Sequence, residues 1–247
     1  MKISVVTAVL NGRETLPAMI QSLTRQTHRD VEHIVQDGGS TDGTQAYLTA
    51  HGHPQMALVS AGDGGIYAAI NAGITRATGD VIGLLHADDQ LADAGVLADV
   101  ALALEDPEID GVYGDLQYVG RGDPTRVIRQ WTAGPFHPSL LLRGWMPPHP
   151  TVYLRRAVFD RCGLYDPNFR ISGDYDAMLR YLTQGDVRLG YLPQVMVRMQ
   201  LGGASNRSFA QILRKSREDY RAIRRHQVGG IGTLVAKNLS KLPQFWS

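Results

Sequence analysis

Strand and helix patterns alternate through the first hundred residues, and this alternation constrains the fold more than any other feature. Residues 3–10 form a β-branched apolar run that ends at Asn11-Gly12, as expected for a strand buried on both faces. Apolar residues then recur at helical spacing, at Leu16, Met19, Ile20 and Leu23. Further strands are predicted over 31–35, 56–60 and 80–85, with helices between them, the last over 65–77. This order is typical of βαβ units around a mainly parallel sheet, an α/β fold.

Two polar loops directly follow predicted strands. One covers residues 37–43 (DGGSTDG) and the other covers residues 86–89 (HADD). Open parallel sheets bind their ligands outside the carboxyl ends of the strands, which is where both loops fall. Their coincidence is the first indication of function.

The second half of the chain has a less regular pattern. A helix is predicted over residues 94–104, a strand over 111–119, and a loop-rich stretch over 121–148. Another short strand is predicted over 151–154. Two helices follow, one from Arg155 that Gly163 caps and one over 174–183.

Composition and length suit one globular α/β domain with a tail. The chain has 247 residues, of which 43% are hydrophobic and 20% charged. Its single cysteine, Cys162, cannot form an internal disulfide, which favours a reducing compartment. A short apolar run soon interrupted by Asn11 and Arg13 indicates a first strand at the N-terminus instead of a signal peptide. No stretch approaches the roughly 18 apolar residues of a membrane-spanning helix.

The net charge of +1 conceals a basic tail. Residues 206–247 hold nine Lys and Arg against two acidic residues, a net charge of +7, which leaves −6 for the remainder. The pattern predicts a basic helix from Phe209, a break at 228–230 and a shorter helix that ends at Leu239. The first helix also carries apolar residues, at Phe209, Ile212, Leu213, Tyr220 and Ile223. Such a helix can lie on anionic lipid, pack on the body of the protein, or form a homodimer contact. The body has no basic face suited to nucleic acid.

The first polar loop offers a carboxylate to a ligand. Asp37 at a strand end can accept a hydrogen bond from a nucleobase N–H, and the neighbouring glycines let a ligand approach the backbone. A tight turn with Asx caps before a helix at Thr44 explains the same residues, and by itself it is the stronger interpretation.

Another acidic residue, Asp63, precedes the predicted helix over 65–77. Free N–H groups at the start of a helix favour anions, although an N-cap is the simpler interpretation of Asp63. Asn71 and Gly73 interrupt an otherwise Ala-rich helix, and a glycine there costs about 1 kcal/mol. Close packing or contact with a ligand would account for them.

The acidic turn over residues 86–89 places two adjacent carboxylates, Asp88 and Asp89, after a buried strand. They repel each other unless a cation neutralises them. Mg²⁺ and Mn²⁺ take oxygen ligands and often complete their shell with substrate phosphates. A solvated turn in which Asp89 or Asp93 caps the next helix explains these four residues equally well.

Two further segments carry single reactive groups. Asp174 stands where a helix begins and can either deprotonate an acceptor hydroxyl or cap the helix, whereas Asp176 is better explained by an ion pair with Arg180. His149 lies between prolines that fix the local backbone, and it is either a ligand-binding or a structural histidine. The chain has no GxGxxG after the first strand, no GxxxxGK[ST] and no GxSxG. Dinucleotide redox, P-loop and nucleophile-elbow enzymes therefore lose their main support.

Taken together, five segments make the chain resemble the family 2 glycosyltransferases of the GT-A type, and among them the WcaE-like enzymes of bacterial exopolysaccharide and O-antigen assembly. In order they are SVVTAVLNG, QDGGSTDGT, GDGGIYAAINAGITRATGDVIGLLHADD, MPPHPTVYLRR and ISGDYDAMLR, within residues 3 to about 203. Each is weak alone, but five in this order are specific. The resemblance implies a GT-A (Rossmann-like) domain over 1–205 with a mainly parallel sheet flanked by helices. It has a nucleotide-sugar-binding half over 1–118, an acceptor-binding half over 119–205, and a basic helical extension over 206–247.

The resemblance also implies residue roles. The nucleotide sugar is expected at Ala8, Asn11, Asp37, Asp63, Asn71, His86 and Ala87. Asp88, with Asp89 beside it, resembles the Mg²⁺ or Mn²⁺ ligand of the DxD-type motif. Asp174 matches the catalytic base of the Glu-Asp motif, and the acceptor is expected near His149, Trp145 and Tyr175. The chain departs from the pattern at His86, where Asp is common, and at Gly173, where Glu is usual. A histidine can still bond a ribose hydroxyl or bind a metal.

The implied activity is a metal-dependent, inverting transfer of a sugar from a nucleoside-diphosphate sugar, with a UDP-sugar favoured. The expected acceptor is a lipid-linked glycan or an oligosaccharide in bacterial polysaccharide biosynthesis, reached in the cytoplasm at the inner face of the plasma membrane. Two alternatives stay open. The altered His86 and Gly173 allow a nucleotide-sugar-binding assembly protein that has lost activity. A sugar nucleotidyltransferase has poor support from the single glycine and arginine of residues 10–14.

Overall fold

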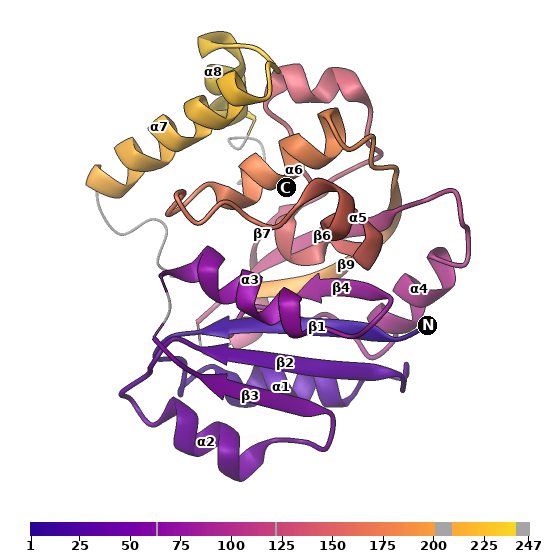
Figure 1. The fold of residues 1–247 in the computed structure, drawn as a ribbon, viewed down its shortest axis with the longest axis vertical. Helices are drawn as coiled ribbons and strands as arrows, with labels where there is room; N and C mark the ends of the chain where they lie inside the picture. The colour runs from indigo at the N-terminus through magenta and orange to yellow at the C-terminus, as the bar shows by residue number, and fades with distance from the viewer. Residues whose placement is uncertain (63, 122, 201–208, 241–247) are drawn as a thin grey trace.

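The computed structural model describes residues 1–62, 64–121, 123–200 and 209–240. Within these residues nine strands form one sheet in the order β3-β2-β1-β4-β8-β6-β9-β5, and β7 pairs with β6 beside this path (Figure 1). The strands are β1 (Ile3–Val9), β2 (Val31–Asp37), β3 (Met56–Ser60), β4 (Val81–Leu84), β5 (Asp89–Leu91), β6 (Gly111–Gly120), β7 (Asp123–Trp131), β8 (Tyr153–Arg155) and β9 (Leu189–Gln200). The helices are α1 (Leu16–Thr24), α2 (Thr44–His51), α3 (Ile66–Arg76), α4 (Val96–Ala103), α5 (Arg156–Cys162), α6 (Gly173–Thr183), α7 (Phe209–Arg225) and α8 (Ile231–Leu239), with 3₁₀ turns η1 (Pro138–Arg143) and η2 (His149–Thr151).

The half of the sheet formed by β1 to β4 is parallel. β1 pairs with β2 on one side and with β4 on the other, and β3 pairs with β2 in the same direction. All seven residues of β1 are buried, and their side chains alternate between the two faces. Val5 belongs to the core that contains α1, whereas Val6 belongs to the core that contains α3. The predicted α/β fold is confirmed.

Helices cover both faces of this sheet. One core joins α3, α5 and α6 to it, and the other joins α1, α2 and α4. Gly73 of α3 lies so close to β1 that a Cβ atom there would come within 2.3 Å of Cγ1 of Val6. Close packing of helix on strand therefore accounts for the glycine that interrupts α3.

The second half of the sheet is mixed. β8 pairs antiparallel with both β4 and β6, whereas β6 pairs parallel with β9. The predicted loop over 121–148 is wrong in part, because residues 123–131 form β7, antiparallel to β6. Within the described residues β7 pairs with β6 alone, and Val127 and Ile128 are exposed. A strand outside the core has no need for the apolar alternation by which strands are recognised.

The C-terminal helices form an additional layer on α6. α7 packs on α6, and α8 packs on α7 and η1 (Figure 1). The buried face of α7 contains Asp219, Ala222 and Ile223, and His226 just after the helix is also buried, so this face packs on the body of the protein. Its other face leaves Ile212, Leu213 and Tyr220 exposed. Among the described residues, no helix combines the length and apolar character needed to cross a bilayer. The expected domain boundary at 205/206 lies outside the described residues.

Replacing Gly73 with alanine is expected to lower the free energy of unfolding by about 1–3 kcal/mol, because the new methyl group would overlap Val6. Gly232 of α8 is the matched control, since nothing lies within 4 Å of a Cβ atom there. Gly232→Ala is expected to leave stability unchanged or raise it by up to about 1 kcal/mol. Urea unfolding followed by circular dichroism measures both variants. Equal stability of Gly73→Ala and the wild type would contradict the close contact between α3 and β1.

Candidate active site

Parallel pairing brings the loops after β1, β2 and β4 to one edge of the sheet. The last residue of β1, Val9, lies opposite the last residue of β2, Asp37, and Val6 lies opposite Leu84 at the end of β4. The loop after β1 also touches the acidic turn, since a Cβ atom at Gly12 would lie 3.3 Å from Cβ of Ala87. The two polar loops predicted from the sequence therefore meet at this edge, as expected.

Asp37 is fully buried and organises the loop after β2. Its carboxylate accepts hydrogen bonds from the backbone N–H of Ser40 at 3.2 Å, from the Ser40 hydroxyl, and from the Ser60 hydroxyl at 2.6 Å. The Asx-type turn anticipated for this loop is therefore present. The Ser40 N–H also lies 3.2 Å from the second oxygen, so each oxygen of Asp37 accepts two bonds and the carboxylate holds this loop in shape.

Asn11 joins the loops after β1 and β2. Its backbone N–H donates to the Ser40 hydroxyl at 2.7 Å, and its side-chain oxygen accepts from the N–H of Thr41 at 2.9 Å. Asn11 has a φ of 54°, a left-handed conformation that asparagine tolerates better than most residues. The exposed Asn11 thus lies next to the loop of Asp37, on the solvent side of this edge of the sheet.

Three other residues expected at the nucleotide sugar have different surroundings. Asp63 lies outside the described residues. Ala8 is buried in the core on the α3 face, so its side chain contacts protein. Asn71 donates to the backbone oxygen of Tyr165 at 2.7 Å and accepts from its N–H at 3.0 Å. The polar residue within α3 therefore ties this helix to the segment that precedes α6.

The acidic turn buries a carboxylate without a hydrogen-bond partner in the described part of the chain. Asp89 is 0% exposed, and none of the described residues bonds to either of its side-chain oxygens. Burial and the neighbouring Asp88 carboxylate raise the pKa of Asp89 well above its usual value. Asp89 does not cap a helix, because its oxygens accept no hydrogen bond from the described residues, whereas Asp93, the other residue of that alternative, accepts the N–H of Gly95 just before α4 at 2.7 Å. An uncompensated buried carboxylate is costly, and a bound cation would remove that cost.

The structure brings His86 and His149 together, although 63 positions separate them in the sequence. Their ring centroids lie 6.3 Å apart. Burial lowers the pKa of His86, and the negative charges of Asp88 and Asp174 act against this shift. Burial lowers the pKa of His149 to about 4, while Asp174 opposes the shift and His86 adds to it. Since such effects weaken with distance, the two histidines lie near Asp174, and His86 also lies near Asp88.

Asp174 occupies the first turn of α6 and faces a group of tyrosines. Its carboxylate accepts the N–H of Tyr175 at 2.8 Å, and the Tyr67 hydroxyl lies 3.4 Å away. The Tyr165 hydroxyl lies 2.8 Å from Nε2 of His149. Burial raises the pKa of Tyr118 of β6, Arg129 opposes the shift, and Asp89 and Asp174 add to it. Tyr118 therefore lies near both acidic groups.

These tyrosines are the site residues that sequence reasoning missed. Tyr67 stands within the resembling segment before Asn71, which was the only available signal for it. Tyr118 and Tyr165 belong to no motif, so nothing in the sequence distinguishes them from core aromatics. Only the fold shows that they surround Asp174.

Tyr67 also explains the departure at Gly173. A Cβ atom at Gly173 would lie 2.7 Å from Cε2 of Tyr67, so the tyrosine ring fills the space that a larger residue would need. The Tyr67 hydroxyl donates to the backbone oxygen of Ile171 at 2.7 Å. Glycine at position 173 and tyrosine at position 67 are therefore a matched pair in this chain.

Two residues expected at the acceptor have side chains engaged elsewhere. Tyr175 is 1% exposed, and Nζ of Lys237 lies 2.9 Å from its ring centroid, beneath α8. Trp145 stacks on Phe136 at 5.2 Å and meets the edge of Tyr113 at 5.7 Å. Both shape the core around this half of the protein.

The interpretation of Asp176 as a structural residue agrees with its surroundings. Its carboxylate forms the expected i,i+4 ion pair with Arg180 at 3.7 Å. It also contacts Nε2 of His226, in the loop after α7, at 2.9 Å. Asp176 is 0% exposed, so it serves the contact between α6 and the C-terminal helices.

Asp88 and Asp89 fit a divalent cation that is shared with a ligand. Among the described residues, no three His, Cys, Asp or Glu side chains are grouped to hold a metal ion by themselves. The two oxygens of Asp89 without partners and the adjacent Asp88 supply hard oxygen ligands. Mg²⁺ commonly binds through one or two protein carboxylates plus phosphates of the substrate. This turn can provide the carboxylates.

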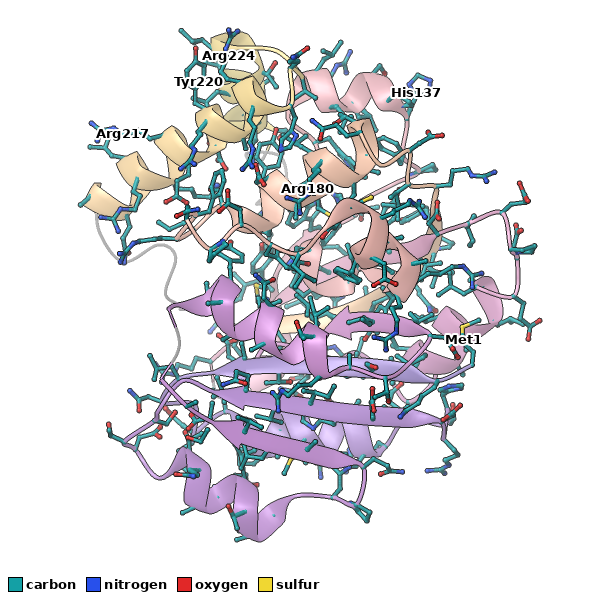
Figure 2. All side chains as sticks on the ribbon, viewed as in Figure 1. Met1, His137, Arg180, Arg217, Tyr220 and Arg224 are labelled. Carbon is teal, nitrogen blue, oxygen red and sulfur yellow. The ribbon has the colours of Figure 1, made fainter. Side chains whose placement is uncertain are left out.

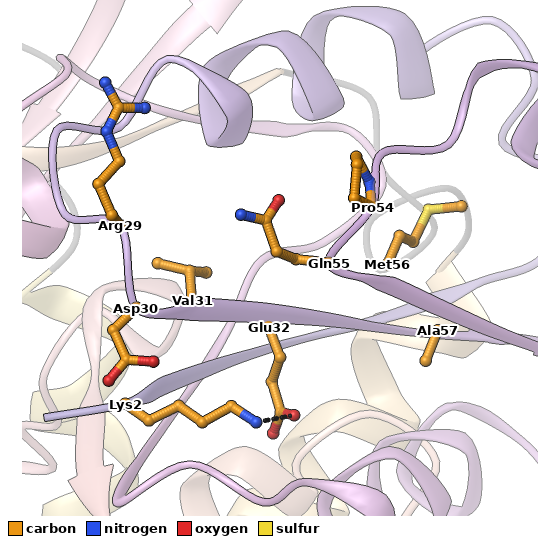
Figure 3. Close-up of a pocket in the computed structure, with 9 residues that line it drawn as sticks. All are labelled: Lys2, Arg29, Asp30, Val31, Glu32, Pro54, Gln55, Met56 and Ala57. Atoms are coloured by element: carbon orange, nitrogen blue, oxygen red, sulfur yellow. Dashed lines mark ion pairs between the residues drawn. The ribbon is translucent and has the colours of Figure 1, made fainter.

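A surface hollow of about 420 Å³ lies at the opposite edge of the sheet (Figure 3). It is lined by residues at the amino ends of β1, β2 and β3, and an ion pair of 2.7 Å between Lys2 and Glu32 crosses its floor. Ligands of open parallel sheets bind at the carboxyl ends of the strands. The hollow is therefore separate from the group around Asp88 and Asp174.

Comparison with known proteins identifies a family. A family model described as Glycosyl transferase family 2 matches residues 4–170. The PGL/p-HBAD biosynthesis glycosyltransferase of Mycobacterium tuberculosis is 33% identical over 208 residues, which cover 82% of this chain and 78% of that protein. An uncharacterized glycosyltransferase of Nostoc sp. is 28% identical over 218 residues, which cover 83% and 66% of the two chains.

Solved structures share the fold. A fragment of S. aureus TarS in complex with UDP-GlcNAc superposes with a TM-score of 0.70 at 17% identity, covering 92% of this chain and 66% of the fragment. The chain thus spans just under two thirds of that fragment. The mannosyltransferase PcManGT from Pyrobaculum calidifontis, in complex with GDP-Man and Mn²⁺, gives a TM-score of 0.69 at 18% identity, covering 99% and 71%. These likenesses confirm the expected GT-A type of α/β fold.

The buried His149 predicts acid destabilisation. Its pKa falls from 6.5 to about 4 on folding, so the unfolded chain binds the proton more readily between these values. Above pH 6.5 neutral His149 makes its full contribution to the free energy of unfolding. As the pH falls toward 4, this contribution is lost, by up to about 3 kcal/mol. His149→Gln lacks this proton site and can still bond Tyr165.

Urea unfolding of the wild type and His149→Gln between pH 7 and pH 4 tests this effect. The stability advantage of the wild type over the variant is expected to shrink by up to about 3 kcal/mol across this range. Carboxylates elsewhere contribute equally to both proteins and cancel in the difference. A difference that stays constant with pH would contradict a buried, neutral His149.

Proposed function

The chain belongs to glycosyl transferase family 2 and is a glycosyltransferase; from that premise we propose that it moves a sugar from a nucleoside-diphosphate sugar by a metal-dependent single displacement with inversion. One observation carries the proposal. The carboxylate of Asp89 is buried and unpartnered among the described residues, its neighbour Asp88 and the more distant Asp174 both act on His86, and so all three acidic groups belong to one site. This arrangement brings a place for a cation and a diphosphate near a place for a base.

The donor would lie along the edge formed by the loops after β1, β2 and β4. Asp37 is proposed to contact the nucleobase because it ends β2 at this edge, and Asn11 bonds to the same loop. His86 and Ala87 of the acidic turn are proposed to contact the donor beside these loops, and Asp63, which lies outside the described residues, stays an expected contact of the nucleotide. Ala8 and Asn71 would act indirectly, through core packing and the bond to Tyr165. A UDP-sugar is the favoured donor, and the neighbours in complex with UDP-GlcNAc and GDP-Man support a nucleoside-diphosphate sugar in general.

Asp88 and Asp89 of the acidic turn would hold Mg²⁺ or Mn²⁺. When bound, the cation offsets the negative charge that develops on the departing diphosphate. The structural neighbour in complex with GDP-Man and Mn²⁺ supports this role. His86 is held neutral by burial and can donate to a ribose hydroxyl or a phosphate oxygen.

Asp174 would act as the general base for the acceptor. As the acceptor oxygen forms its bond to the anomeric carbon, its proton passes to the Asp174 carboxylate, and the bond from that carbon to the diphosphate breaks on the opposite face. The Tyr67 hydroxyl, 3.4 Å from the carboxylate, helps to orient it. His149 would face the acceptor, while Trp145 and Tyr175 support that half from within the core.

A catalytically impaired assembly protein is the second candidate, because His86 and Gly173 depart from the family pattern. The packing of Tyr67 against Gly173 argues against loss of function at that position, since the space is filled and Asp174 remains in place. Both Asp88 and Asp174, the groups that the reaction requires, are retained.

The proposed acceptor is a lipid-linked glycan of bacterial polysaccharide synthesis, such as an exopolysaccharide precursor, reached at the cytoplasmic face of the membrane. The outer face of α7 supports this part of the proposal. It exposes Leu213 and Tyr220 among four arginines, and Arg217, Tyr220 and Arg224 extend away from the body of the protein (Figure 2). The four are Arg214, Arg217, Arg221 and Arg224. Arginines beside apolar side chains are the composition by which a helix lies on anionic lipid.

Asp88→Ala and Asp174→Asn are expected to affect different steps. Asp88→Ala removes a cation ligand and should lower metal-dependent release of nucleoside diphosphate from a panel of nucleotide sugars by about 10²–10³-fold. Asp174→Asn keeps the cation site and the donor site, so it should bind donor normally yet lose transfer to an acceptor hydroxyl by about 10²–10⁴-fold. Asp30→Asn, an exposed carboxylate at the other edge of the sheet, is the control.

Chromatography of released nucleoside diphosphate measures both steps, with and without Mn²⁺. Donor binding without hydrolysis or transfer in the wild type would favour the impaired assembly protein. Release of pyrophosphate from a nucleoside triphosphate would favour a nucleotidyltransferase.

The membrane contact is tested by co-sedimentation with anionic vesicles. Replacing Arg214, Arg217 and Arg224 by Gln is expected to weaken binding about 100-fold at low salt, since each charge near the surface contributes about 1 kcal/mol. Gln at Arg25, Arg29 and Arg188 of the body is the control with the same change in net charge. Equal sedimentation of both triple variants, or dimerisation through α7 in place of vesicle binding, would reject the proposed surface.

A further inference from the structure

The segment that carries Asp174 into α6 is held by a residue of the C-terminal helices. Three consecutive backbone N–H groups, those of Arg170, Ile171 and Ser172, converge on the Glu218 carboxylate of α7. The donor–acceptor distances are 3.2, 2.8 and 2.9 Å in that order. Bonds from N–H to a carboxylate are charge-assisted and about twice as strong as neutral ones. Glu218 therefore fixes the backbone immediately before Gly173 and Asp174.

A residue of α3 bonds to a backbone carbonyl of the same segment. The backbone oxygen of Ile171 accepts from the Tyr67 hydroxyl at 2.7 Å, while its N–H donates to Glu218. Tyr67 also lies against Gly173 and 3.4 Å from the Asp174 carboxylate. The backbone immediately before Asp174 is thus held by Tyr67 of α3 on one side and by Glu218 of α7 on the other.

α7 is anchored around Glu218 by charged and apolar contacts. The adjacent Asp219 is 1% exposed and pairs with Lys215 of the same helix at 2.8 Å and with Lys237 of α8 at 3.1 Å. Past the end of α7, His226 pairs with Asp176 of α6 at 2.9 Å. The buried Ala222 and Ile223 of α7 belong to the same core as α6. These contacts hold the helix that carries Glu218 against α6 and α8.

We propose that Glu218 is a positioning residue for the transfer reaction, which sets the Asp174 carboxylate against the acceptor hydroxyl by clamping residues 170–172. The inference rests on the proposed function of Asp174 as the base. It gives α7 a part in catalysis that is separate from its outer, basic face. A displacement of about 1 Å at a catalytic group can cost about 10²-fold in rate, so loss of the clamp has a measurable effect.

Glu218→Ala and Glu218→Gln test this role. Glu218→Ala removes all three bonds and is expected to lower kcat for transfer by about 10²-fold while the donor KM stays within about twofold. Glu218→Gln keeps one acceptor oxygen without the charge, so its kcat is expected to fall only about tenfold. Glu108→Gln, an exposed carboxylate paired with Arg188 far from the site, is the matched control and keeps the wild-type kcat.

Hydrogen exchange on the full-length variants supplies a readout that does not depend on activity. In Glu218→Ala the amides of residues 170–172 are expected to exchange faster, while those of β1 and β2 keep their protection. A folded Glu218→Ala with wild-type kcat would overturn the proposal. So would a parallel loss of kcat, donor binding and protection throughout the protein, because that pattern indicates a purely structural residue.

The two proposals fail in different ways. A wild-type chain that transfers no sugar to any acceptor and releases no nucleoside diphosphate rejects the proposed function, and with it the role of Glu218 in transfer. A wild-type chain that transfers sugar at the same rate as Glu218→Ala rejects the positioning role alone. Unchanged exchange at residues 170–172 rejects the clamp itself, whatever the activity.

Discussion

Parallel pairing of β1 with β2 and β4 is the constraint on which the rest of the structure depends. A strand paired on both sides and covered on both faces must alternate its side chains between two cores, as Val5 and Val6 do. The same direction of the strands brings three loops to one edge, where Asp37 and the acidic turn meet. The close approach of α3 to β1 at Gly73 then places Tyr67 at that edge. The parallel pairing of β1 with β2 and β4 therefore determines both the two cores and the position of the candidate site.

The charges at this edge are the strongest support for the proposed cation site. Asp89 is buried without a partner beside Asp88, which is unfavourable for a folded chain unless a cation binds there. The other buried carboxylates of the described residues have partners. Asp37 and Asp115 accept hydrogen bonds, Asp219 pairs with two lysines, and Asp176 pairs with His226 and arginines. Asp89 therefore differs from the carboxylates that hold loops and the C-terminal helices in place.

The sequence allows prediction of helices and strands whose buried residues recur at a regular spacing, and of motifs whose residues are contiguous in the chain. The β1 run, the α1 stripe and the two C-terminal helices with their break follow from such patterns. β7 and β9 escaped because they lie where neither face is fully covered, so their side chains have no strict alternation. In the site, the acidic turn and Asp174 could be singled out by their positions. The meeting of His86 with His149, the tyrosines, and the bonds from residues 170–172 to Glu218 could not, because they join segments that only the tertiary fold brings together.

The central claim is that the acidic turn holds a cation together with the diphosphate of the donor. Anomalous scattering from crystals grown with Mn²⁺ and a UDP-sugar tests it most directly. The account predicts one strong Mn²⁺ peak about 2.1 Å from a carboxylate oxygen of Asp88, with diphosphate oxygens in the same shell and Asp89 in contact with the ion or its ligands. A diphosphate bound at this edge with no Mn²⁺ at Asp88 or Asp89, or Mn²⁺ bound elsewhere in the protein, would contradict it.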